Sequence, residues 1–196
     1  MLFFILPYPV VRHVPVPVAE AKTGGFAALE VCIGTEPLQE AISRVQAQHP
    51  DARRIAIADF SLPSTSQRFY VIDLEKEQIL LQTWVAHGKN SGDLYARKFS
   101  NTPSSLMSSQ GLYEVGEKFE SPRHGPSRVL LGLDKGINDN AQEREIILHG
   151  ADYVGEAFIE AHGFCGRSHG CPALPRADMD RAIALLEPGS LLYIHR

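Results

Sequence analysis

A glycine-rich stretch near the C-terminus gathers the side chains most able to do chemistry. Residues 163–174 read Gly-Phe-Cys-Gly-Arg-Ser-His-Gly-Cys-Pro-Ala-Leu and combine thiol, imidazole, hydroxyl and guanidinium groups. Cys171 lies between Gly170 and Pro172, which both disfavour the interior of helices and strands, so we expect its thiol on a turn. Glycine also lets the backbone approach a substrate closely, so N–H groups here could face a developing oxyanion.

A histidine upstream could activate this thiol. The apolar run 146–148 is typical of a short strand and ends at His149-Gly150. A free thiol has a pKa near 8.5 and is mostly protonated at neutral pH, so Cys171 needs a base or a cationic neighbour. Imidazole titrates in the range that suits a general base. We therefore predict Cys171 as nucleophile and His149 as its base.

These residues also carry a resemblance to a known family. His149-Gly150 followed by Ser-His-Gly-Cys at 168–171 resembles the signature of the L,D-transpeptidases, the YkuD-type enzymes that cross-link peptidoglycan. The string 166–173 resembles the subfamily described as murein L,D-transpeptidase catalytic domain proteins. Similar segments follow one another from about Ile55 to the C-terminus, at 58–61, 85–88, 99–103 and 132–141.

The resemblance implies a reaction and its surroundings. Cys171 would form a thioester with a peptidoglycan stem peptide, release D-Ala and pass the acyl group to the side-chain amine of a second stem, without metal or organic cofactor. In the resembling enzymes a carbonyl or hydroxyl just after the catalytic histidine orients the ring. Here that residue is Gly150, so only its carbonyl can accept from His149. Carbapenems should acylate the thiol, and the cell envelope (periplasmic or secreted) is the expected location.

Four further residues of the glycine-rich loop are predicted to bind substrate: Arg167, Ser168, His169 and Gly170. Backbone N–H groups of His169, Gly170 and Cys171 could form an oxyanion hole. Arg167 could lower the pKa of the thiol or hold a substrate carboxylate bidentately, although a solvated loop arginine stays an open alternative. Ser168 could equally bond its own loop in an ST-turn.

Some features leave the substrate open. His87, Asn101 and His124 lie in segments that resemble substrate-lining loops, and surface and site roles are both open for each. Many resembling enzymes carry Asn or Arg two residues after the nucleophile, whereas this chain has Pro172-Ala173. Hydrolysis of wall peptides by the same Cys–His site, as a carboxypeptidase or endopeptidase, is an alternative outcome to transfer.

A zinc-binding module is the competing class of function. Its five possible ligands are His149, His162, Cys165, His169 and Cys171. Their spacing contains no CxxC or HExxH element and matches structural or catalytic zinc sites poorly, so we predict no metal site.

Composition limits the functions further. The 196 residues, with a formal net charge of −4, give no basic footprint for nucleic acid and suffice for one domain with a sizeable core. Three cysteines are too few for a disulfide scaffold. We expect Cys32 to be a small buried hydrophobe. Cys165 could pack in the core or form a reversible disulfide with Cys171, and packing is favoured.

The chain divides into a leading segment and one catalytic domain. Residues 1–25 are apolar and proline-rich and could be an export signal or a lead-in, and they are too short and too broken by proline to span a membrane. Residues 26–196 form the domain, which we expect to be monomeric. Its N-terminal helix covers about 36–48, with Thr35 as N-cap and Pro37 in the first turn.

The rest of the pattern predicts a β-rich fold. Expected strands are 54–60, 69–74, 79–87, 112–115, 129–133, 145–149 and 191–195, and expected helices are 153–161 and 179–186. Residues 90–110 form a long polar loop, of the kind that often binds ligands or closes over them. Short strands with few helices favour a mainly antiparallel β-sandwich or open barrel, and the resemblance implies the same fold.

Overall fold

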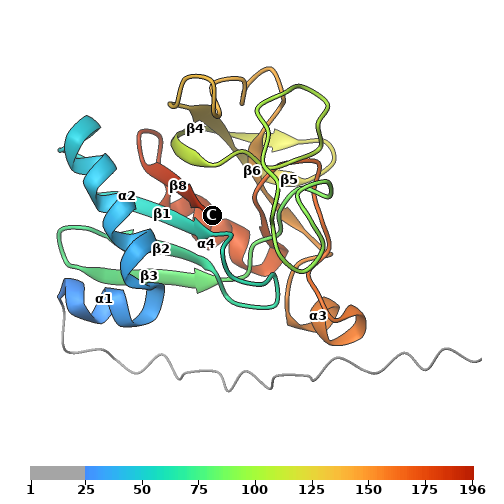
Figure 1. Ribbon diagram of the computed structural model, residues 1–196, viewed down its shortest axis with the longest axis horizontal. Helices are drawn as coiled ribbons and strands as arrows, with labels where there is room; N and C mark the ends of the chain where they lie inside the picture. Colours follow the sequence, from blue (N-terminus) through green and yellow to red (C-terminus); the bar gives the residue numbers. More distant parts are fainter. Residues whose placement is uncertain (1–24) are drawn as a thin grey trace, which may run out of the picture.

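The computed structural model describes residues 25–196, which form one eight-stranded sheet flanked by short helices (Figure 1). The expectations for residues 1–24 lie outside the described residues, and the domain boundary near residue 25 stays a prediction. The elements are α1 (Phe26–Ile33), α2 (Thr35–Gln48), β1 (Arg54–Asp59), β2 (Phe69–Asp73), β3 (Gln78–Thr83), β4 (Gly111–Ser121), β5 (Gly125–Gly132), β6 (Ile147–Ala151), α3 (Glu156–His162), β7 (Ala173–Pro175), α4 (Arg176–Leu185) and β8 (Leu191–His195).

Alternation along the central strands builds a core on each face of the sheet. On β1, Ile55 and Ile57 pack with α1, α2 and strand neighbours in one cluster, whereas Ala56 and Ala58 pack with α4 residues such as Ala182 in another. Successive side chains of a strand point to opposite faces, so both sets are fully buried. This explains why β1, β2 and β8 read as continuous apolar runs.

The sheet is mixed and nearly closed. The strand order is β3-β2-β1-β8-β4-β5-β6-β7, with β1–β8 and β6–β7 parallel and the other pairs antiparallel. Beyond β3 the chain crosses to the other edge strand, where Ala86 N–H donates to Ala173 O at 2.8 Å across an isolated antiparallel bridge. The predicted β-rich open barrel is therefore confirmed, with two parallel pairings that the sequence pattern did not show.

One strand prediction needs correction, and the structure adds one strand and one helix that were not predicted. The strand expected at 79–87 ends at Thr83, because the residues after it leave β2 and pair instead with β7 and the loop before it. Strand β7 was not predicted, since three residues next to Pro172 give no periodicity. Helix α1 was also missed, because its apolar sequence lacks a helical period and it is held by the burial of Leu29 and Ile33.

Helix α2 confirms the predicted N-terminal helix but not its cap. The helix begins at Thr35 itself, Gly34 is the N-cap residue without a side-chain hydrogen bond, and Pro37 lies in the first turn as expected. Each helix in residues 25–196 is too short or too polar to cross a bilayer.

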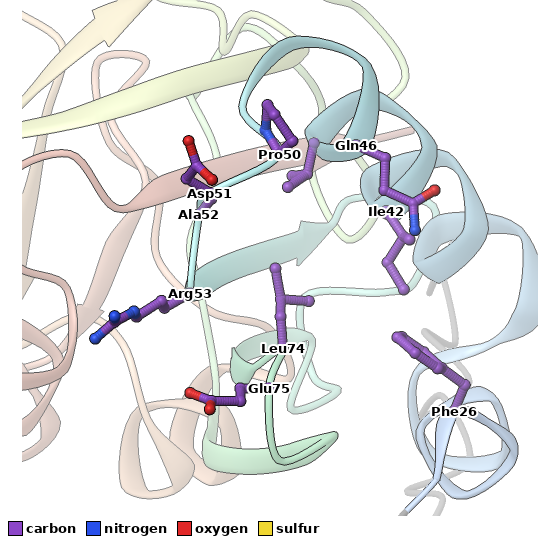
Figure 2. A pocket seen from close by; sticks show the side chains of 10 residues that line it. Phe26, Ile42, Gln46, Pro50, Asp51, Ala52, Arg53, Leu74 and Glu75 are labelled. Carbon is purple, nitrogen blue, oxygen red and sulfur yellow. The ribbon is translucent and has the colours of Figure 1, made fainter.

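A surface groove of about 360 Å³ lies beside α1 and α2, far along the chain from the predicted nucleophile. Ile42, Leu74 and Phe26 point into it, and Arg53 and Glu75 lie at its edge (Figure 2). None of the predicted catalytic or substrate-binding residues lines this groove, so it is separate from the candidate site.

Candidate active site

Cys171 lies on a turn two residues before β7, as the sequence indicated. Strand β7 pairs in parallel with β6, with His149 opposite Ala173. This pairing brings the turn against the segment that leads into β6, and Cys171 Sγ lies 3.6 Å from the carbonyl oxygen of Glu145. The fold thus places Cys171 two residues before Ala173, the residue of β7 that pairs with His149 of β6.

His149 has an oriented ring, which is one of the features that a general base requires. It is buried within β6, and its Nδ1 lies 3.1 Å from the carbonyl oxygen of Gly150. A carbonyl can only accept, so in the neutral ring Nδ1 carries the proton and Nε2 keeps its lone pair. A Cβ on Gly150 would lie 3.2 Å from Arg176 Cα, at the start of α4. Glycine therefore supplies the orienting carbonyl where a side chain would crowd α4.

Burial sets the protonation of both groups. It lowers the pKa of His149 from about 6.5 to about 4, with the Gly150 hydrogen bond opposing this and His124 and Arg176 adding to it. Burial also raises the pKa of the Cys171 thiol, while the Ile147 N–H and the Arg144 charge act against the rise. At neutral pH the pair is a neutral thiol beside a neutral imidazole.

His124 is brought to the site by the β4–β5 hairpin. Its ring stacks on that of His149, with centroids 3.8 Å apart and planes tilted by 32°. Arg176 holds the hairpin by donating from Nη1 to the His124 carbonyl at 3.0 Å. Of the two roles left open for His124, the structure favours the one at the site.

The loop before Cys171 is shaped by Ser168. Its Oγ donates to the Cys171 carbonyl at 2.6 Å and accepts from the Gly170 N–H at 3.1 Å, as in the ST-turn alternative. The Gly170 N–H is therefore occupied, which corrects the expectation that it is free for an oxyanion. The backbone N–H groups of His169 and Cys171 stay predicted donors. The His169 side chain is exposed.

Arg167 is engaged by neighbouring loop residues. It forms an ion pair with the exposed Asp93 and lies with its guanidinium 5.8 Å from the centre of the Phe164 ring. An exposed pair of this kind contributes little stability, so Arg167 can exchange Asp93 for another carboxylate. Substrate binding by Arg167 stays a prediction.

His87 and Asn101 have structural contacts. His87 is buried, its Nδ1 lies 2.8 Å from Nη2 of the buried Arg68, and its Nε2 lies 3.2 Å from Gly92 O. Because arginine only donates, Nδ1 accepts and Nε2 carries the proton. Asn101 donates to Asp139 Oδ1 at 2.6 Å and joins two loops. Of the two roles left open for His87, the surface role is wrong.

The buried histidines predict a loss of stability in acid. Burial, with the charge of Arg68, lowers the pKa of His87 to about 4, and His149 is shifted similarly. Between pH 6.5 and 4 the unfolded chain binds protons that the folded chain does not, so stability falls as pH falls through that window. We expect a loss of at most about 3 kcal/mol for each histidine, measured by urea unfolding at pH 7.5 and 4.5. The exchange His149→Gln should remove part of the loss, and an unchanged profile would contradict this assignment.

The long loop predicted at 90–110 is confirmed as irregular structure and packs on the turn of Cys171. Ser108 Oγ accepts from the Gly88 N–H at 3.0 Å and donates to the Gly170 carbonyl at 3.1 Å. Arg144, from the turn before β6, also reaches this loop through Met107 O. The sequence gives no signal for Arg144, because it lies outside every motif and its contacts come from distant residues.

The other two cysteines are free and lie in different surroundings. Cys165 is fully buried in a cluster with Ala86 and Ala173, which favours the packing role. Cys32 is exposed on α1, so the expectation of a buried hydrophobe is wrong. The reason is that Leu29 and Ile33 form the buried face of this helix, and Cys32 falls outside it.

Within residues 25–196, no three His, Cys, Asp or Glu residues gather in a group that could hold a metal ion. The candidate ligands of the zinc alternative are therefore not assembled by this fold. That the reaction needs no metal or organic cofactor stays a prediction.

The fold and the site define a β-rich domain with a thiol on a turn beside a buried, carbonyl-oriented imidazole. A family model described as L,D-transpeptidase catalytic domain matches residues 34–195. The chain belongs to this family. A search of curated proteins gave no match.

Solved structures similar to this chain include L,D-transpeptidases from three bacteria. That from Mycobacterium smegmatis is 14% identical over 74% of this chain and 59% of its own, with a TM-score of 0.46. A mutant of the Enterococcus faecium enzyme is 13% identical over 72% and 49%, with a TM-score of 0.45. The Xylanimonas cellulosilytica protein is 12% identical over 80% and 69%, with a TM-score of 0.44. The chain thus spans less than two thirds of the first two proteins.

Proposed function

We propose that this chain is a cysteine-dependent L,D-transpeptidase that acts on peptidoglycan stem peptides in the cell envelope. The observation that supports the proposal is the pairing of β7, which begins two residues after Cys171, with β6 at His149, whose Nδ1 faces the Gly150 carbonyl, in a chain of the L,D-transpeptidase catalytic domain family. These are the parts of a thiol nucleophile with an oriented base.

The first step forms a thioester. Sγ of Cys171 attacks the carbonyl of the L-centre that precedes the terminal D-Ala of a donor stem, and its proton passes to Nε2 of His149. The carbon–nitrogen bond to D-Ala breaks, and His149 returns the proton to the leaving amine. Backbone N–H groups of His169 and Cys171 would hold the oxyanion.

The second step transfers the acyl group. The side-chain amine of a second stem attacks the thioester, a carbon–nitrogen bond forms, the carbon–sulfur bond breaks, and Cys171 recovers its proton through His149. By the resemblance, the bridge joins two diaminopimelate residues. Arg167, if it releases Asp93, could hold a stem carboxylate.

The test is intact mass of the purified protein after mixing with a carbapenem, beside a Cys171→Ala control. We expect a stoichiometric adduct equal to the whole carbapenem, since opening of the β-lactam ring loses no atoms, and none in the control. A persisting adduct in the control would overturn the assignment of Cys171, and an adduct in neither protein would contradict an activated thiol. With a tetrapeptide donor and an amine acceptor, a dimeric product indicates transfer and a free tripeptide indicates hydrolysis.

A further inference from the structure

Arg144 fastens the long loop before β4 to the start of β6. Its Nη1 donates to Ser100 O at 2.8 Å and to Ser109 Oγ at 2.9 Å. Its Nη2 donates to Met107 O and, at 3.4 Å, to Ser105 Oγ. Four of the five guanidinium N–H groups can be occupied in this way, so the fork is committed to the protein and not open to a substrate carboxylate.

The charge of Arg144 is not neutralised where it lies. All four acceptors are uncharged oxygens, and within residues 25–196 no salt bridge involves this guanidinium. Nη2 is so close to the turn of the nucleophile that a Cβ on Gly170 would lie 3.2 Å from it. An unpaired, half-buried cation is screened weakly by solvent and favours negative charge nearby.

Glu145, the next residue, also faces the nucleophile. It adopts a left-handed backbone with φ of 54°, and its carbonyl is the 3.6 Å neighbour of Cys171 Sγ. A non-glycine residue holds this conformation only where its surroundings impose it. The contacts of Arg144 with the long loop hold the backbone at the residue immediately before Glu145. The same guanidinium therefore constrains the Glu145 carbonyl that faces the thiol.

We propose that Arg144 is a positioning residue for the nucleophile: it clamps the 100–109 loop against the turn of Cys171 and supplies the positive charge that stabilises the thiolate as it forms. The inference rests on the role of Cys171 proposed above. The charge and the hydrogen bonds of Arg144 can be tested separately, because lysine keeps the positive charge but cannot reproduce the fork of hydrogen bonds.

The experiment compares Arg144→Lys and Arg144→Met in a Cys32→Ser background, which removes the exposed thiol. Arg181→Met is the matched control, since Arg181 makes one exposed backbone contact, to Leu80 O on β3. The first measurement is the pH midpoint of iodoacetamide alkylation at Cys171, located by peptide mass. The second is hydrogen exchange of residues 100–109.

We expect Arg144→Met to raise the alkylation midpoint by about one pH unit, and Arg144→Lys to keep it near the wild-type value. Both variants should speed exchange in the loop, and the control should change neither quantity. A folded Arg144→Met protein with an unchanged midpoint would overturn the role of the charge, and unchanged exchange in both variants would overturn the clamp.

If Arg144→Met does not fold, Arg144→Lys decides. Faster loop exchange with a wild-type midpoint supports the proposal, and exchange like that of the wild type overturns it. Neither measurement requires turnover. A failure of the proposed function, seen as the missing carbapenem adduct, is therefore distinguishable from a failure of this inference.

Discussion

Replacing His149 by glutamine should slow acylation of Cys171 by a carbapenem by about 100- to 10,000-fold, the range that a general base contributes. The neutral pair makes this loss large, because burial raises the pKa of the thiol and little thiolate exists without a proton acceptor. Glutamine has nearly the length of histidine and is uncharged, as the buried imidazole is at neutral pH, so the fold should persist. The measurement is the rate of adduct formation by intact mass at pH 7.5.

The matched control is His162→Gln at the end of α3, an exposed histidine whose ring stacks on Phe158 and whose Nδ1 faces Phe158 O. It should be acylated at the wild-type rate. Wild-type acylation of the His149→Gln protein would remove His149 from the mechanism and leave activation of Cys171 to the charge of Arg144.

A large loss of stability should follow Gly132→Ala. A Cβ at this position would lie 1.9 Å from Asn138 O and 2.4 Å from its carbonyl carbon, so backbone must move. Asn138 is buried and holds its loop by donating to Gln110 O at 3.1 Å and Leu112 O at 2.9 Å. Overpacking of this kind costs on the order of 3 kcal/mol. Urea unfolding at pH 7.5 measures it.

Gly136→Ala is the comparison within the same loop. Nothing lies within 4 Å of its Cβ position, and the only penalty is the φ of 76°, which costs a side chain about 1 kcal/mol. Equal losses of stability in the two variants would show that the backbone near Gly132 and Asn138 can move apart at no cost in free energy.

The sequence predicted the candidate catalytic residues better than it predicted their contacts with distant parts of the chain. Cys171 on a turn, His149 at a strand and the Gly150 carbonyl follow from residue types and short spacings. The structure shows the contact of His149 with the Gly150 carbonyl and the pairing of β7 with β6 at His149. Strand β8 and helix α2 were also predictable, because β8 is a short, nearly continuous apolar run and the apolar residues of α2 repeat at the helical period. These features are local in the chain, so local patterns contain them.

What could not be predicted depends on pairing between distant segments. The stacking of His124 on His149 requires β5 of the β4–β5 hairpin to pair with β6. The four contacts of Arg144 require the long loop to pack on the turn before β6. Cys32 was misassigned for a similar reason. Which face of α1 is buried depends on its contacts with α2 and the sheet, not on its composition.

The bridge between Ala86 and Ala173 has a consequence for how the protein folds. It joins residues far apart in sequence through two hydrogen bonds, 2.8 and 3.4 Å long, and it lies next to the turn of Cys171. Closing so long a loop costs chain entropy that only the two folded halves of the sheet can offset. The bridge between Ala86 and Ala173 should therefore form late in folding. The β6–β7 pairing closes a much shorter loop, so the turn of Cys171 can be anchored to β6 before it is anchored to Ala86.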